Sequence, residues 1–128
     1  MPIVHVHVAR GRTAAEKKAI LDGVHAALVE AFRIPETDRN QILHEHDEAN
    51  FESSKGREFT LVEATVFPGR SDAAKKTLFA SIVRRLQSAP GIAPEKVLVV
   101  LHEPPLVNWG IRGGQSAAAV DIGFKIDV

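Results

Sequence analysis

Hydrophobic and polar positions alternate at the start of this chain. Over residues 3–8, the sequence IVHVHV places valines on one side and His5 and His7 on the other. A period of two predicts a strand, because successive side chains of a strand point to opposite faces. Pro2 precedes this segment, and proline fits the first residue of a strand because it has no N–H to donate to a sheet.

The period then changes to that of a helix, from residue 13 to about residue 32. Thr13 and Glu16 have the three-residue spacing of a capping box. Pro35 predicts that the helix ends before it. A second strand is expected at residues 40–46. The apolar positions that recur at helical spacing are Ala15, Ile20, Val24, Ala27, Leu28 and Ala31.

The same order of elements returns in the second half of the chain. Residues 59–66 are strand-like, residues 71–87 have a helical pattern, and residues 97–101 are a dense aliphatic run. Several motifs recur 58 positions later, as Gly11 does at Gly69. The matches are Gly11-Arg12-Thr13 with Gly69-Arg70-Ser71, Lys17-Lys18 with Lys75-Lys76, His44-Glu45 with His102-Glu103, and Asn50-Phe51 with Asn108-Trp109.

We therefore predict a single domain over residues 1–128, made of two β-α-β pseudo-repeats at about 2–51 and 60–109. Such a unit pairs its strands in parallel through a right-handed crossover. The fold class is α+β, with a four-stranded sheet and two helices on one face. The other face needs cover, most simply from another subunit. Strand-like runs at 117–120 and 122–126 predict a C-terminal hairpin that pairs with a neighbour's sheet edge.

Composition excludes several classes of protein. Lys plus Arg and Asp plus Glu each number 16, so no net charge favours nucleic acid or an anionic membrane as a partner. Hydrophobic residues make up 45% and charged residues 25%, as in ordinary globular proteins. There is no cysteine, hence no disulfide and no thiolate nucleophile. Without an apolar run of membrane-spanning length, the sequence predicts a soluble, cytoplasmic protein.

Pro2 is the residue with the most distinctive chemistry. If Met1 is removed, Pro2 becomes a secondary amine, and ordinary α-amino groups have a pKa of about 7.7–8.0. Apolar walls and nearby arginines lower such a pKa, and the neutral amine then acts as a general base. In the second half Thr60 stands where Pro2 stands in the first. Only the first half can therefore carry this chemistry.

Two other kinds of site are weaker. His5 and His7, and likewise His44 and His46, place two imidazoles on one strand face, a spacing that metals use. The interpretation we favour is that these histidines are polar residues facing another subunit, with no metal. The glycine-rich run at 110–114 follows a strand but opens no helix, so it does not predict a phosphate site.

These features together resemble the tautomerase superfamily, whose members are β-α-β proteins with an amino-terminal catalytic proline. The start Pro2-Ile3-Val4 and the Gly-Arg-Thr motif at 11–13 resemble that family. Residues 109–114, WGIRGG, are similar to the Phe-Gly-Ile-Gly-Gly segment of 4-oxalocrotonate tautomerase, with Arg112 as an extra residue. The double length resembles the fused members, which assemble as trimers. Residues 38–46, DRNQILHEH, resemble the malonate semialdehyde decarboxylase branch.

The resemblance implies a site without metal or cofactor, in a homotrimer that binds a small carboxylate. It implies Pro2, Asp38 and Arg70 as catalytic residues. A further arginine is expected at position 68, where this chain has Pro68, and Arg12 or Arg112 is available in its place. Two aromatic residues, Trp109 and Phe124, are candidates for the walls of the pocket, or else for the core.

Three functions stay open at this point. The first is a tautomerase with Pro2 as general base on a small 2-oxo or enol carboxylate. The second is a decarboxylase or hydratase of a 3-oxo acid, in which Pro2 stays protonated and polarises a carbonyl. The third is a non-catalytic oligomeric module in which Pro2 only begins a strand. The protonation state of Pro2 distinguishes the first two.

Overall fold

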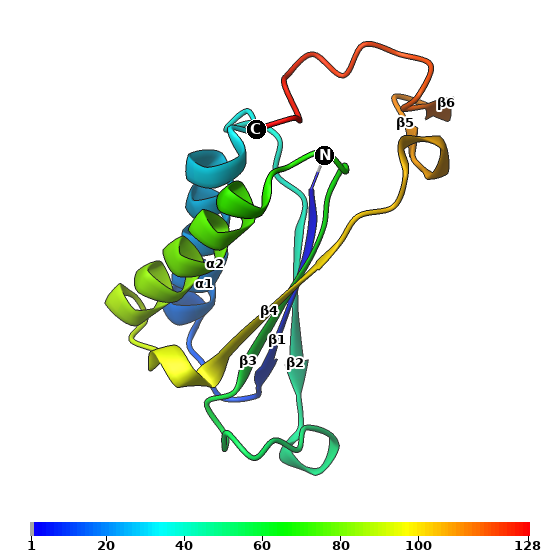
Figure 1. The fold of residues 1–128 in the computed structure, drawn as a ribbon. Coiled ribbons are helices and arrows are strands. Elements are labelled where there is room, and N and C mark those ends of the chain that lie inside the picture. Colours follow the sequence, from blue (N-terminus) through cyan, green and yellow to red (C-terminus); the bar gives the residue numbers. More distant parts are fainter. Residues whose placement is uncertain (1) are drawn as a thin grey trace.

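A computed structural model describes residues 2–128, and its elements follow the predicted order closely (Figure 1). The first half contains β1 (Ile3–Ala9), α1 (Ala14–Phe32) and β2 (Gln41–His46), and the second contains β3 (Thr60–Thr65), α2 (Asp72–Ser88) and β4 (Val97–His102). Short 3₁₀ helices lie between these elements at Glu48–Asn50 and Pro94–Lys96, and after β4 at Leu106–Asn108. The last elements are β5 (Gly110–Ile111) and β6 (Gln115–Ser116).

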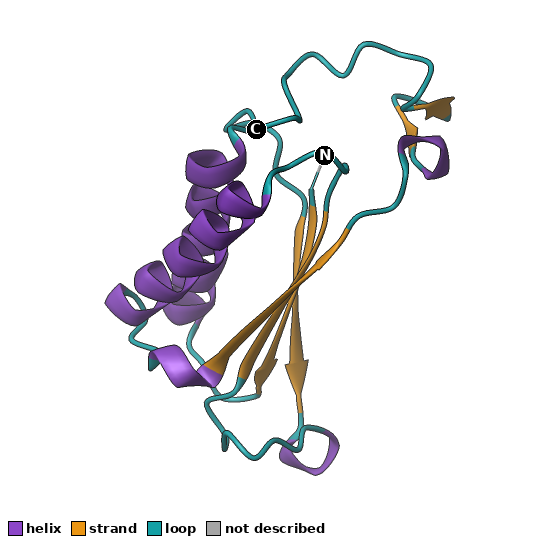
Figure 2. Ribbon diagram, in the orientation of Figure 1, coloured by secondary structure: helices purple, strands orange, loops and turns teal. Residues whose placement is uncertain are grey.

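The four long strands form one mixed sheet in the order β2-β1-β3-β4. Each half contributes a parallel pair, β1 with β2 and β3 with β4, and β1 joins β3 antiparallel. Both helices lie in one layer against one face of the sheet (Figure 2). The predicted α+β architecture is confirmed.

The valines of β1 form the centre of the core. Val4 and Val6 are fully buried and pack with α1 residues such as Val24 and α2 residues such as Ile82. The alternation of β1 therefore decided which side of the strand faces the helices, as the period of two predicts. His5 and His7 lie on the opposite, outward face.

The two helix starts are near copies of each other. Thr13 closes a capping box with Glu16, and Ser71 caps α2 by accepting a hydrogen bond from the N–H of Ala74. The glycines before these caps have φ values of +126° at Gly11 and +123° at Gly69, a backbone region that other residues rarely adopt. The repeat seen in the sequence is thus repeated in backbone conformation.

The same correspondence holds between helix and strand. Lys17 of α1 contacts Glu45 of β2 at 2.7 Å, and Lys75 of α2 contacts Glu103, directly after β4, at 2.7 Å. These are the Lys and Glu residues that match between the halves of the sequence. They hold each helix over the parallel pair of its own half.

The C-terminal segment departs from the prediction. A hairpin exists, but it consists of β5 and β6, and residues 117–126, all of which the structure describes, contain no strand. Positive φ values at Arg112, Gly113 and Gly114 make the turn earlier than expected. The strands predicted at 117–120 and 122–126 were wrong because alanines dominate the first run and Gly123 interrupts the second. This segment packs instead through its apolar side chains beside Phe67.

Within residues 2–128 no helix is both long enough and apolar enough to cross a membrane.

Candidate active site

Pro2 lies at the end of the sheet where β1 begins. Its carbonyl accepts a hydrogen bond of 3.3 Å from Nδ2 of Asn40, and the N–H of Val4 donates to the Asn40 carbonyl at 2.9 Å. The side chain of Pro2 is buried. Met1, whose removal is needed to free the Pro2 amine, lies outside the described residues.

Arg70 reaches the same end of the sheet from the second half. Ile3 pairs with Thr65 at the end of β3, and the chain continues from there to Arg70. Arg70 is only 6% exposed, and its Nη1 donates to the Phe67 carbonyl at 2.9 Å. Its guanidinium also lies 4.8 Å from the ring centre of Phe32, a cation–π distance.

One donor of Arg70 is unused. The Nε atom is buried and has no hydrogen-bond partner among the residues that the structure describes. Burial lowers the pKa of Arg70, and the negative charge of Glu103 raises it by a smaller amount. An arginine stays a cation at neutral pH even so. Leaving a buried donor unpaired is costly, so an anion that reached this atom would be bound favourably.

A cavity of about 280 Å³ lies at this end of the molecule and collects several predicted residues. Asp38, Arg112 and Phe124 all line it. Both terminal nitrogens of Arg112 donate to backbone carbonyls, those of Asp121 and Ile122, which fixes the guanidinium against the C-terminal segment. The remaining lining residues are Pro35, Thr37, Phe67, Ile111 and Ile122.

Phe67 is the residue of this site that sequence reasoning missed. It is almost fully buried, lines the cavity, and its carbonyl holds Arg70. Its ring packs edge-on against Trp109, with ring centres 4.8 Å apart, and stacks with Phe124 at 6.4 Å. The sequence feature that could have indicated Phe67 is its position directly before the turn formed by Pro68, Gly69 and Arg70.

Trp109 is not among the residues that line the cavity. It packs behind Phe67 in a small hydrophobic cluster, and its indole N–H donates to the Pro104 carbonyl at 3.1 Å. Of the two readings considered for Trp109, this placement favours the core. Phe124 belongs to the same cluster and also reaches the cavity.

Arg12 is not brought to this end of the sheet. It follows β1, whereas Pro2 precedes that strand, so the whole length of β1 lies between them. Its Nη1 contacts Glu16 at 3.0 Å, in a separate cavity of about 230 Å³ that Arg57 and Glu58 also line. Nearby, the buried Thr60 donates its hydroxyl to the Glu58 carbonyl. At that end of the sheet the residue equivalent to Pro2 is the internal Thr60, which has no free α-amine, and Arg12 is already paired with Glu16.

No metal site is found in the part of the chain that the structure describes. The predicted histidines do lie together on the outward face, but no group of three or more metal-ligating side chains there could hold an ion. A larger cavity, of about 530 Å³, lies along the helices and is lined by His25, Glu30 and Arg85 among others. None of Pro2, Asp38 and Arg70 lines it. Of these three, Asp38 lines the cavity of about 280 Å³, and Pro2 and Arg70 line neither cavity.

Comparison with known proteins gives a consistent result over the whole length. Two family models described as tautomerase enzyme match the chain, one over residues 38–112 and the other over residues 2–52. The probable tautomerase YrdN of Bacillus subtilis (strain 168) is 30% identical over 122 residues, covering 91% of this chain and 95% of that protein. The probable tautomerase YusQ of the same organism is 24% identical, with coverage of 91% and 97%.

Solved structures agree. The Q0 fused 4-OT, described as a wild-type symmetric trimer, is 28% identical with a TM-score of 0.82, and the likeness covers 91% of this chain and 97% of that one. FG41 malonate semialdehyde decarboxylase inhibited by 3-bromopropiolate is 31% identical with a TM-score of 0.73, covering 91% and 92%. A further malonate semialdehyde decarboxylase, for which decarboxylase and hydratase activities are described, is 28% identical with a TM-score of 0.78, covering 88% and 92%.

Proposed function

The chain belongs to the tautomerase family, and on that premise we propose that it is a cofactor-independent tautomerase acting on a small 2-oxo or enol carboxylate. Pro2, freed by removal of Met1, is the general base, and Arg70 binds the carboxylate of the substrate. The observation that carries the proposal is the buried, unpartnered Nε of Arg70 at the end of the sheet where Pro2 lies.

The reaction needs one base that can also return a proton. The neutral Pro2 nitrogen accepts the enol O–H proton, and the carbonyl forms as the carbon–carbon double bond takes up a proton from the same nitrogen. Pro2 ends neutral again, and no other reactant is consumed. The buried surroundings of Pro2 and the nearby cation of Arg70 disfavour the prolinium, which keeps the base available.

The charged residues at this end of the sheet orient the substrate. Arg70, which lies outside the lining of the cavity, binds a planar carboxylate through parallel hydrogen bonds. Arg112 in the cavity wall supplies a second positive charge, and Asp38 in the same wall orients Pro2 or the enol hydroxyl. Phe67 and Phe124 exclude water, which strengthens these charge interactions.

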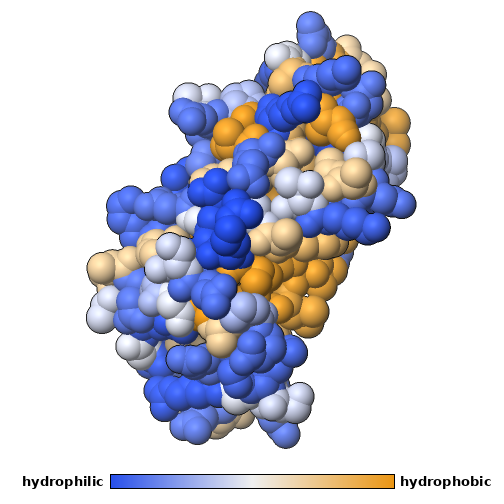
Figure 3. Space-filling model, turned by 60° about the vertical axis from the view of Figure 1, so that its left-hand side comes forward, coloured by the Kyte–Doolittle hydropathy of each residue, from blue (hydrophilic) through white to orange (hydrophobic). Residues whose placement is uncertain are grey.

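We propose that the active form is a homotrimer of a single domain built from the two pseudo-repeats. The trimeric fused 4-OT supports this because its likeness spans nearly all of both chains. The sheet supports it as well, since Ile42, Leu98 and Val100 are 37–49% exposed on its outward face. Figure 3, in which the side of the helices is turned toward the viewer, shows a mostly hydrophilic surface with hydrophobic residues at its centre right and in its upper part.

The second candidate is a decarboxylase or hydratase in which Pro2 stays protonated. Two observations favour it: the likeness to malonate semialdehyde decarboxylases and the shared cavity of Asp38 and Arg112. In this version Arg112 takes the place of the arginine missing at Pro68, and Asp38 activates water. A protonated Pro2 polarises the substrate carbonyl and takes no proton from carbon.

The test follows the ultraviolet loss of the enol of phenylpyruvate with the unmodified chain, Pro2→Ala and Arg12→Gln. We expect rapid ketonisation that collapses to background in Pro2→Ala and is retained in Arg12→Gln. Near-background rates for the unmodified chain overturn the tautomerase proposal. Loss of carbon dioxide from 3-oxopropanoate, together with an amine pKa well above neutral in an NMR titration of Pro2, then establishes the decarboxylase.

Intact mass distinguishes both enzymes from a non-catalytic module. A chain that keeps Met1 has no free Pro2 amine, and neither reaction can then be catalysed by it.

A further inference from the structure

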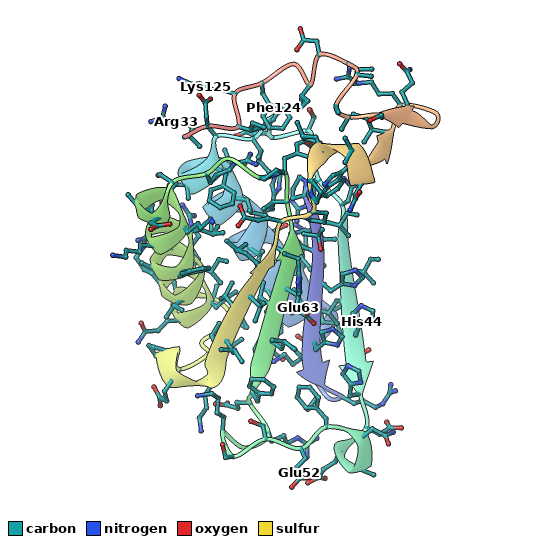
Figure 4. The ribbon with its side chains drawn as sticks, turned by 45° about the vertical axis from the view of Figure 1, so that its right-hand side comes forward. Arg33, His44, Glu52, Glu63, Phe124 and Lys125 are labelled. Carbon is teal, nitrogen blue, oxygen red and sulfur yellow. The ribbon has the colours of Figure 1, made fainter. Side chains whose placement is uncertain are left out.

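Five of the six histidines lie on one surface, the face of the sheet turned away from the helices. We call this surface the histidine face and define it by His5, His7, His44, His46, His102 and Glu63. Figure 4 labels His44 and Glu63, and both side chains project from the sheet on the side away from the helices. The sixth histidine, His25, lies in α1.

The histidines of β1 and β2 are paired with one another. Nδ1 of His5 lies 2.8 Å from Nε2 of His44, and Nδ1 of His7 lies 2.8 Å from Nε2 of His46. The rings of His7 and His44 also stack, with centres 4.4 Å apart. A hydrogen bond between two imidazoles needs one N–H and one bare nitrogen. Each pair tolerates one added proton, and a second proton leaves two donors facing each other.

Few charges compensate added protons on this face. Glu63 lies in β3 between the histidine groups, 2.9 Å from Nε2 of His102 and 3.7 Å from Nε2 of His7. Among the described residues, it is the one carboxylate that the four strands place on this face. Beyond the ends of β1 and β2, Arg10 and Asp47 form an ion pair of 2.7 Å and contribute no net charge.

Apolar side chains surround the same histidines. Phe51 stacks on His46 with ring centres 5.2 Å apart, and Phe59 follows at 5.5 Å from Phe51. Ile42 of β2 and Leu98 and Val100 of β4 are exposed beside them. A surface that mixes neutral imidazoles with exposed aliphatic residues is suited to burial against protein. The pKa of His7 is lowered, and burial is the largest cause. The neighbouring His44 and His46 lower this pKa further, and Glu63 has the opposite, smaller effect.

We propose that the imidazole pairs of the histidine face, which the trimer of the proposed function buries between copies of this chain, make the assembly sensitive to pH, stable near neutral pH and weakened by mild acid. This inference rests on the trimer of the proposed function. The occupant is another copy of this chain because the exposed aliphatic residues and the histidines form one continuous surface, and because the trimeric fused 4-OT resembles the chain over nearly its whole length.

The sign of the effect follows from linkage. A histidine that stays neutral in the trimer but takes up a proton in the separated chain favours dissociation as the pH falls below the pKa of that histidine in the separated chain. For His7 this pKa is already lowered from 6.5 by burial and by the neighbouring histidines, so its contribution begins below pH 6.5. Each pH unit below that pKa weakens assembly about tenfold for every such histidine.

The experiment measures molar mass by light scattering and helix content by circular dichroism between pH 8 and pH 5.5. It compares the unmodified chain, His7→Gln with His46→Gln together, Glu63→Gln, and His25→Gln as a control for a histidine elsewhere. We expect a trimer at pH 8 that becomes a smaller, still helical species by pH 5.5. The double variant should resist acid, and Glu63→Gln should dissociate at a lower pH than the unmodified chain, because the Glu63 carboxylate raises the pKa of His7.

Several outcomes overturn the inference. A trimer that persists unchanged to pH 5.5 overturns it and leaves the proposed function intact. Loss of mass that coincides with loss of helix content, or a Glu63→Gln midpoint equal to that of the unmodified chain, overturns it as well. If the double variant does not assemble at pH 8, the inference is tested by the difference between the dissociation midpoints of Glu63→Gln and the unmodified chain. A monomer at pH 8 removes the proposed trimer itself, while phenylpyruvate ketonisation reports separately on catalysis.

Discussion

Arg12 and Arg70 occupy equivalent positions at the starts of the two helices, yet only Arg12 is neutralised by the next turn of its helix. Arg12 contacts Glu16 at 3.0 Å, whereas the residue equivalent to Glu16 in the second half is Ala74. Nε of Arg70 has no hydrogen-bond partner among the described residues. The two copies of the motif thus differ in one acidic residue, Glu16. Arg70, which has no such acid in the next turn of its helix, lies at the end of the sheet where β1 begins.

This difference gives a matched test of substrate binding. We expect Arg70→Gln to lower kcat/KM at least about 30-fold, because a charge-assisted hydrogen bond is worth about 2 kcal/mol. Arg70→Lys should recover only part of this, since an ammonium cannot form two parallel bonds. Steady-state ketonisation of phenylpyruvate enol measures both variants. Arg12→Gln is the control, and an equal loss in that variant would contradict the role proposed for Arg70.

The equivalent glycines give a second matched pair. Gly69→Ala and Gly11→Ala both place a side chain at φ near +125°, so each should cost more than about 1 kcal/mol of stability in urea unfolding. An added Cβ at Gly69 also lies 3.3 Å from the Ile126 carbonyl, whereas at Gly11 it meets the movable Arg57 side chain at 3.4 Å. Gly69→Ala should therefore displace the C-terminal segment and reduce activity. Equal activity in the two variants would show that this segment does not form part of the site.

The two helix caps should differ in their contribution to stability. Thr13→Ala removes the bond that the Thr13 hydroxyl accepts from the N–H of Glu16, but the backbone N–H of residue 13 still donates to the Glu16 carboxylate. Ser71→Ala removes the bond accepted from the N–H of Ala74 and also the bond that the Ser71 hydroxyl donates to the Val128 carbonyl at 2.8 Å. Loss of such a cap costs about 1 kcal/mol. We expect the larger loss in Ser71→Ala, measured as the shift of the urea midpoint at constant m-value. The reverse order would show that the bond to Val128 adds nothing to the stability of the fold.

Acid should weaken the fold through Glu45. The hydrogen bond from Lys17 is the largest cause that holds the pKa of Glu45 below its ordinary value of 4.5. A carboxyl group with a lowered pKa stabilises the folded state above its unfolded value, and that contribution is lost as pH falls through the lowered one. Stability measured between pH 7 and pH 3 should fall less steeply below pH 4.5 in Glu45→Gln. Glu52→Gln, on an exposed loop, serves as the control and should leave the slope unchanged.

The order of elements was predictable because it depends on local periodicity. Alternation in β1, helical spacing in α1 and α2, and the residues of both N-caps are all written in short stretches of chain. Lys17 and Glu45 match Lys75 and Glu103 in the sequence, and each pair forms an ion pair in the structure. The two contacts are equivalent because the β-α-β unit folds in the same way in both halves. Pro2, Asp38 and Arg70 were likewise named as site candidates from the sequence.

Long-range register was not predictable in this way. In the β1–β3 ladder His5 pairs with Glu63, its own equivalent 58 positions later, so the pseudo-twofold relation of the two halves passes through that pair. No local pattern specifies this antiparallel pairing. Pro2 and Arg12 lie at opposite ends of β1 whatever the pairing, but the antiparallel pairing brings Arg70 and Phe67, from the other half, to the end of the sheet where Pro2 lies.

The sequence by itself determined the two β-α-β units, their caps and the side of β1 that faces the helices, because these follow from the spacing of residues along one segment. Tertiary structure alone decided which arginine lies near Pro2, which histidines pair, and where residues 117–128 pack. Those outcomes depend on contacts between residues far apart in the chain. Their geometry is set by strand register and by the space left beside Phe67.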